Sequence, residues 1–239
     1  ASEAFERAGD LAGKGWSTGL LAYVRIYDGR FTEADELARQ TLLDAREQGD
    51  RWTQGMMNVA LGTSALWSGR IDDALGHAES AIANFPEGAD SVGVVQAFAT
   101  RGRALVRRGR LDLGFQLLVS AEADHPFGPP NDMLRTSIAA ASVTVGDAAR
   151  AQQYLDGFDE IDTDILGGSE RHVALGLARL QEGDAGAAFE ILDALPGVTD
   201  DTSSRWGWAV TALACAATGR SVEAYADAAW EPPYYFREA

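Results

Sequence analysis

The chain has 239 residues, of which 46% are hydrophobic, and a formal net charge of −16. This acidic balance excludes general binding to nucleic acids or anionic membranes, because both require a basic surface. A single cysteine excludes a disulfide framework, no apolar run approaches the roughly 20 residues of a membrane span, and no signal peptide is visible, so we expect a cytoplasmic protein.

In chain order, the hydrophobic periodicity predicts helices throughout. Residues 2–12 form a short predicted helix, and because this pattern starts with the first residues we expect the sequence to be part of a longer protein. Gly13, Gly15 and Gly19 weaken the helical pattern that follows. Six helix pairs are then predicted, at residues 16–28 with 32–48, 52–68 with 71–84, 90–108 with 111–123, 131–145 with 147–157, 169–182 with 184–194, and 203–218 with 220–230.

Turn-forming residues separate these pairs, including ProPheGlyProPro at 126–130. The connection 158–168 is longer than the others and acidic. The tail, residues 231–239, contains Pro232-Pro233 and cannot be a regular helix there. Its aromatic residues are predicted to cap the last repeat, because a terminal repeat must cover an apolar face.

One glycine recurs between the two helices of every pair, at a spacing of 36 to 40 residues. Glycine suits this place because it adopts the left-handed conformation needed just past a helix end. Small residues accompany it at two fixed offsets, where two helices must approach closely. The turn glycines are Gly29, Gly69, Gly109, Gly146, Gly183 and Gly219; seven residues earlier lie Ala22, Gly62, Gly102, Ala139, Gly176 and Ala212, and five residues later lie Ala34, Ala74, Gly114, Ala151, Ala188 and Ala224.

This layout resembles the tetratricopeptide repeat. The resemblance implies an all-α protein, a right-handed superhelix of about six helix-turn-helix repeats that forms a single solenoid over residues 1–239. The repeats would cover roughly 14–49, 52–88, 90–127, 131–160, 169–197 and 203–230.

No arrangement of residues predicts catalysis. The run GDLAGKG at 9–15 has one residue too few between its glycines for a phosphate-binding loop. Asp159, Asp162 and Asp164 lack the glycine and glutamate of a calcium loop, and the three histidines lack metal-ligand spacing. Cys215 is predicted to be a small core residue. We therefore predict no enzyme, cofactor or metal, with an enzyme using the acidic connection 158–168 as the remote alternative.

In tetratricopeptide arrays the first helix of each pair lines the concave surface, so the resemblance gives candidate binding residues by counting back from each turn glycine. Arg103 and Arg107 lie one helical turn apart in the basic run RGRALVRRGR, and could receive a carboxylate, a phosphate or an acidic peptide. In the alternative interpretation the arginines pair with acids such as Asp112 or Glu122, and the aromatic residues belong to the core. The predicted ligand- or partner-binding residues are Trp16, Tyr23, Tyr27, Trp67, Gln96, Arg103 and Arg107.

Three segments carry a narrower resemblance: AREQGDRW at 45–52, LGTSALWSGR with DALGHA at 61–78, and EADHPFG at 122–128. They resemble the C-terminal helical arrays of MalT-type and large ATP-binding LuxR-type bacterial transcriptional regulators and related ATPase-cyclase proteins. The resemblance implies a sensor or docking arm that binds a protein, a peptide or a small effector in its groove. The ATPase and helix-turn-helix modules of that family have no counterpart in this sequence, so DNA binding and ATP hydrolysis are not expected. The alternative is a structural module that forms homo-oligomers or a scaffold and has no ligand.

Overall fold

The computed structural model describes residues 2–86, 92–156, 168–193 and 202–222. Every regular element in these ranges is an α-helix, as predicted. The chain divides into two compact units, Ala1–Leu117 and Leu118–Ala239. None of the helices in the described ranges is long and apolar enough to cross a membrane.

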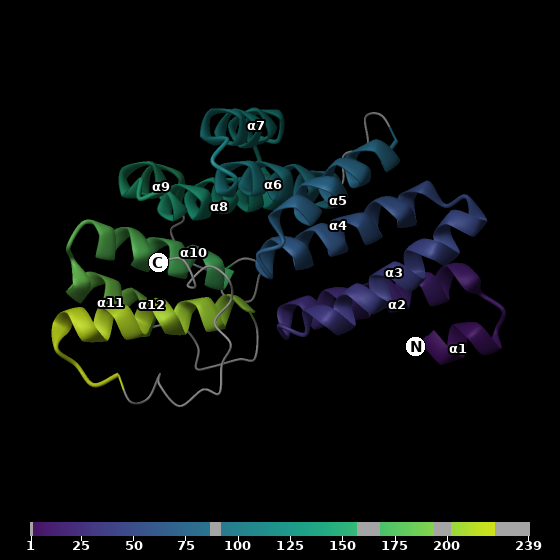
Figure 1. The fold of residues 1–239 in the computed structure, drawn as a ribbon, viewed down its shortest axis with the longest axis horizontal. Coiled ribbons are helices and arrows are strands. Elements are labelled where there is room, and N and C mark those ends of the chain that lie inside the picture. The colour runs from purple at the N-terminus through teal and green to yellow at the C-terminus, as the bar shows by residue number, and fades with distance from the viewer. Residues whose placement is uncertain (1, 87–91, 157–167, 194–201, 223–239) are drawn as a thin grey trace. The chain divides into compact units, whose positions relative to one another are not determined.

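Within each hairpin a short turn joins two consecutive described helices, as between α2 and α3 or α4 and α5 (Figure 1). The first unit holds α1 to α6 and the start of α7, and the second holds the rest of α7 and α8 to α12. Their bounds are α1 Ser2–Arg7, α2 Leu11–Tyr27, α3 Phe31–Gln48, α4 Arg51–Trp67, α5 Ile71–Asn84, α6 Val92–Arg107, α7 Leu111–Asp124, α8 Gly128–Thr144, α9 Ala148–Leu155, α10 Gly168–Gln181, α11 Ala185–Asp193 and α12 Thr202–Thr218.

All six predicted turn glycines follow the end of a helix and have a positive φ, between 70° and 86°. At each of them the same two hydrogen bonds close the helix. At Gly69, for example, the glycine N–H donates to Leu66 O (3.3 Å), and the Arg70 N–H donates to Ala65 O (2.8 Å). This pair of bonds defines the Schellman motif, which uses helix-end carbonyls that would otherwise lack a partner. The sequence prediction of these turns is confirmed.

The predicted helix 220–230 is not helical at residues 220–222, and 223–230 lie outside the described residues. Two further predicted helix boundaries are wrong. The predicted helix 2–12 ends at Arg7, and α2 starts already at Leu11 because the Asp10 side chain accepts a hydrogen bond from Gly13 N (2.9 Å) and caps it. The predicted break at 126–130 contains the start of α8 at Gly128, since Pro129 and Pro130 fit the first helical turn, where an N–H has no partner within the helix.

The two helices of a hairpin approach closely where the small residues lie. Gly13, Gly15 and Gly19, which weaken the sequence pattern, are inside α2. A Cβ at Gly13 would meet the Phe5 ring of α1. A Cβ at Gly19 would lie 2.6 Å from the Met57 side chain of α4. The described small residues at both offsets are buried, except the half-buried Ala212, while Ala224 lies outside the described residues.

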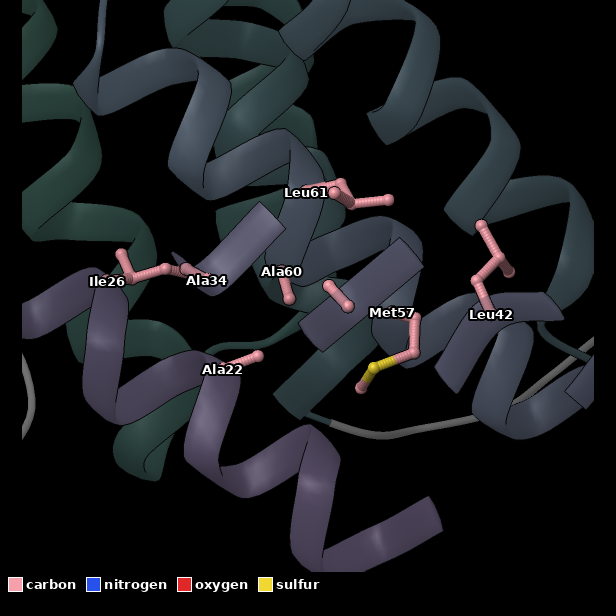
Figure 2. Close-up of a cluster of buried hydrophobic side chains, with 8 residues drawn as sticks. Ala22, Ile26, Ala34, Leu42, Met57, Ala60 and Leu61 are labelled. Atoms are coloured by element: carbon pink, nitrogen blue, oxygen red, sulfur yellow. The ribbon is translucent and has the colours of Figure 1, made fainter. Parts of the chain in front are cut away.

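A cluster of buried side chains joins α2, α3 and α4 (Figure 2). Alanines bring the helices together, and the larger side chains fill the space between them. Burying each of the larger ones stabilises the fold by about 1.5–3 kcal/mol relative to exposure. The cluster consists of Ala22, Ile26, Ala34, Ala38, Leu42, Met57, Ala60 and Leu61.

The first helices of successive hairpins pack against one another within each unit. In the first unit α2 contacts α4 and α4 contacts α6; in the second unit α8 contacts α10 and α10 contacts α12. The second helices α3, α5, α9 and α11 each pack against the first helices before and after them in sequence. This order brings residues of α2, α4 and α6, although about 40 residues apart in sequence, onto neighbouring helices.

Candidate binding surface on α2, α4 and α6

The predicted binding residues lie on three neighbouring helices of the first unit: Trp16, Tyr23 and Tyr27 on α2, Trp67 on α4, and Gln96, Arg103 and Arg107 on α6. The Trp16 side chain lies outside what the structure describes. We call the other six the α2–α4–α6 residues.

Trp67 and Arg103 meet between α4 and α6. The guanidinium carbon of Arg103 lies 5.3 Å from the centre of the Trp67 ring, within the range of a cation–π interaction. Both residues are only 8% exposed. Such a contact is worth about 2 kcal/mol when it is desolvated, so it holds the guanidinium plane in a fixed orientation.

Two further α6 side chains reach α4. Arg107 Nη1 donates to the backbone carbonyl of Leu66 (2.9 Å), and Gln96 Nε2 donates to Thr63 Oγ1 (3.2 Å). The Arg107 bond recurs in the second unit, where Gln181 Nε2 on α10 donates to Val143 O on α8 (2.7 Å). Arg107 and Gln181 both lie two residues before a turn glycine. Their acceptors, Leu66 and Val143, both lie three residues before the turn glycine of the preceding hairpin. The same interhelix bond is therefore made at equivalent positions.

Tyr23 belongs to the contact between α2 and α4. Its hydroxyl donates to Met56 O (3.2 Å). Burial raises the pKa of Tyr23 far above its usual value, and the neighbouring Tyr27 raises it further, so the hydroxyl stays protonated. Beside Tyr23 lies an apolar notch of about 30 Å³ lined in part by Leu20 and Trp52, with room for about one water molecule.

Most α2–α4–α6 residues thus contribute to interhelix contacts. This is similar to the alternative interpretation, in which the aromatic residues belong to the core. The basic run divides in two. Arg101 pairs with Glu79 (3.3 Å) and Arg108 with Asp72 on the hairpin before it, whereas Arg103 and Arg107 lie against α4. The structure brings Trp67, Arg103 and Arg107 together at one end of the α4–α6 contact, while Tyr23 and Tyr27 lie on α2.

A polar cleft of about 470 Å³ between α2, α3 and the start of α4 was missed by the sequence analysis. Lys14 and Thr18 line it from α2, and Gln40, Asp44 and Glu47 line it from α3. Counting along first helices could not reach the three α3 residues, which lie on a second helix, and the two α2 residues are not among the counted positions. The sequence analysis considered Lys14 only as part of the run GDLAGKG, a poor match to a phosphate-binding loop. In the structure this run contains the N-cap of α2.

The remaining sequence candidates have structural roles. Cys215 is buried, as predicted. His77 on α5 is half-buried, with Nδ1 3.1 Å from Asn58 Oδ1 on α4. Burial lowers the pKa of His77, against the opposing effect of Asp73, so the neutral ring is favoured. Among the described residues no group of His, Cys, Asp and Glu could hold a metal ion. Asp159, Asp162, Asp164 and the tail 231–239 lie outside the described residues.

Comparison of the chain with protein-family models and with curated proteins found no match.

Proposed function

We propose that this chain is a non-enzymatic binding domain, an array of tetratricopeptide-like repeats that receives a protein, a peptide or a small effector on its α2–α4–α6 residues. Support for the repeat type comes from the Schellman turn at each recurring glycine and from the packing of successive first helices. By its resemblance to bacterial transcriptional regulators, the domain acts as the sensor or interaction arm of a larger signalling protein.

The observation that carries the proposal is the orientation of two arginines one turn apart on α6. Arg103 lies over the Trp67 ring, and Arg107 donates to Leu66 O, so both side chains are oriented by α4 before any partner binds. In a chain of net charge −16, two positive groups at one place favour a ligand that carries carboxylates. Because little side-chain entropy remains to be lost, binding to such fixed groups is favoured.

The test is binding of a labelled peptide rich in Asp and Glu, compared with the same peptide carrying Asn and Gln. We expect the acidic peptide alone to bind, and the double variant Arg103→Ala with Arg107→Ala to weaken binding by at least about ten- to a hundredfold, which is the loss expected for a single charge-assisted hydrogen bond. Arg110→Ala is the matched control, because it removes an exposed arginine of the same basic run from the turn after α6. Equal weakening by Arg110→Ala, or equal binding of both peptides, would contradict the proposal.

A structural module without a ligand is the second candidate. The burial of Trp67 and Arg103 against each other favours it, because their contact already holds α4 and α6 together. Measurement of the molar mass in solution separates the two candidates. A stable oligomer that binds neither peptide would favour the structural role.

A further inference from the structure

Some first helices follow another first helix of the same unit. In these helices the residues nine and five positions before the turn glycine are buried. Ala60 of α4 belongs to the cluster with Ala22 and Ile26 of α2, and Ala104 of α6 belongs to a cluster with Ala65 and Leu66 of α4. These two positions therefore face the preceding hairpin, since the same clusters also contain residues of the second helices. In α4, α6, α10 and α12 their exposure is at most 4%: Ala60 and Ser64, Thr100 and Ala104, Ala174 and Ala178, Val210 and Ala214.

The same two positions of α2 are exposed and apolar. Leu20 is 48% exposed and Val24 is 50% exposed, and their neighbour Leu21 is 39% exposed. Residues four apart lie on the same side of a helix, so Leu20 and Val24 form one apolar strip on the surface of α2. This strip is equivalent to a surface that the other first helices named above bury against the preceding hairpin.

The junction between α1 and α2 repeats the junction between α3 and α4. Gly9 and Gly49 both have a positive φ, 72° and 69°. Each is followed by an aspartate whose N–H donates to the carbonyl five residues earlier at 2.9 Å, and whose side chain caps the next helix. Residues 2–10 are thus equivalent to residues 42–50, and α1 has the place of the end of a second helix.

We infer that the apolar strip of α2 receives the first helix of a further helical hairpin of this repeat type, with α1 forming the end of that hairpin's second helix. The occupant follows from continuity with the α2–α4 and α4–α6 interfaces. Those interfaces show what the incoming helix must offer: small residues, as Gly19 and Ala22 offer on α2, and an apolar side chain such as Ile26. This inference is independent of the proposed ligand.

The test adds such a hairpin to the chain. A copy of residues 10–41 is inserted directly before Ser2, so that Thr41 of the copy joins the equivalent of Leu42 and its second helix continues into α1. Because each repeat is stabilised by its neighbours, we expect the melting temperature to rise by several degrees and amide exchange in the original α2 to slow by roughly tenfold or more.

Leu20→Glu with Val24→Glu in the original α2 should abolish both gains, because two charges would then be buried in the new interface. The same pair of substitutions should leave the unextended chain folded, since both positions are exposed there. Leu43→Glu is the matched control, because Leu43 is 52% exposed on α3, outside this strip, and should leave both gains intact.

An added hairpin that changes neither melting temperature nor exchange in α2 would overturn the inference. It would also be overturned if the unextended chain were a dimer that Leu20→Glu with Val24→Glu converts to a monomer, because a second copy would then cover the strip.

Discussion

Replacement of Asp35 is expected to be the most informative single change in the first unit. This aspartate on α3 is only 5% exposed, and it joins two hairpins. Its carboxylate accepts a hydrogen bond from Ser64 Oγ of α4 (2.6 Å) and pairs with Arg70 Nη2 (2.8 Å) just before α5. A second pair, with Arg39 (2.9 Å), lies within α3.

The structure sets the size of the effect. Ser64 is 1% exposed, so Asp35→Ala leaves its hydroxyl buried without this acceptor, at a cost of about 1–3 kcal/mol. Breaking a fully buried ion pair costs about 3–5 kcal/mol. The Arg70 side chain is 36% exposed and can be solvated after the change, so we expect a total near the lower end, about 3 kcal/mol. Asp35→Asn retains an acceptor for Ser64 and should cost about half as much.

Urea unfolding followed by circular dichroism measures these differences as shifts of the midpoint at constant slope. Asp73→Ala is the matched control: Asp73 also faces Arg70, but at 3.8 Å and with its side chain 58% exposed, and its loss should cost less than about 0.5 kcal/mol. If Asp35→Ala cost no more than Asp73→Ala, the reasoning from burial would be refuted.

Three further predictions concern α5, α6 and α7. Gly114→Ala should destabilise by about 1–3 kcal/mol, because its Cβ would lie 2.8 Å from the Gly102 carbonyl oxygen, and no loss in thermal unfolding would contradict this close approach. Gly76→Ala, at an exposed helix position with open space, should instead stabilise by about 0.5–1 kcal/mol in the same assay. Because burial lowers the pKa of His77 in the folded state, its stabilising contribution is complete above the unfolded pKa of about 6.5 and is lost as pH falls through the folded value. His77→Gln should therefore lose less stability than the wild type when urea midpoints at pH 7.5 and pH 5 are compared, and equal losses would show that His77 does not titrate in this way.

Much of the local structure could be predicted because it depends on short-range constraints. A positive φ just past a helix end favours glycine strongly, so Gly29, Gly69 and their equivalents marked the turns before any contact was known. The α1–α2 boundary was misjudged for a related reason. Glycines lower helix propensity, but the Asp10 cap and the packing of Gly19 against Met57 outweigh that preference.

The candidate site was predicted less completely. Helical periodicity placed Trp67 and Arg103 on adjacent first helices, yet it could not show that they contact each other or that both would be buried. The polar cleft beside Lys14 was not predicted at all, since it lies where the start of α2 and the end of α3 meet the start of α4.

The sequence by itself determined the helical class of the described residues and the positions of the turn glycines, because each depends on backbone conformation over a few neighbouring residues. Only the tertiary structure decided which polar side chains meet, as when Asp35 accepts from Ser64, 29 residues away, and which apolar strip of α2 stays exposed. Those outcomes depend on the rotation and crossing of whole helices, which are set by the packing of many side chains together.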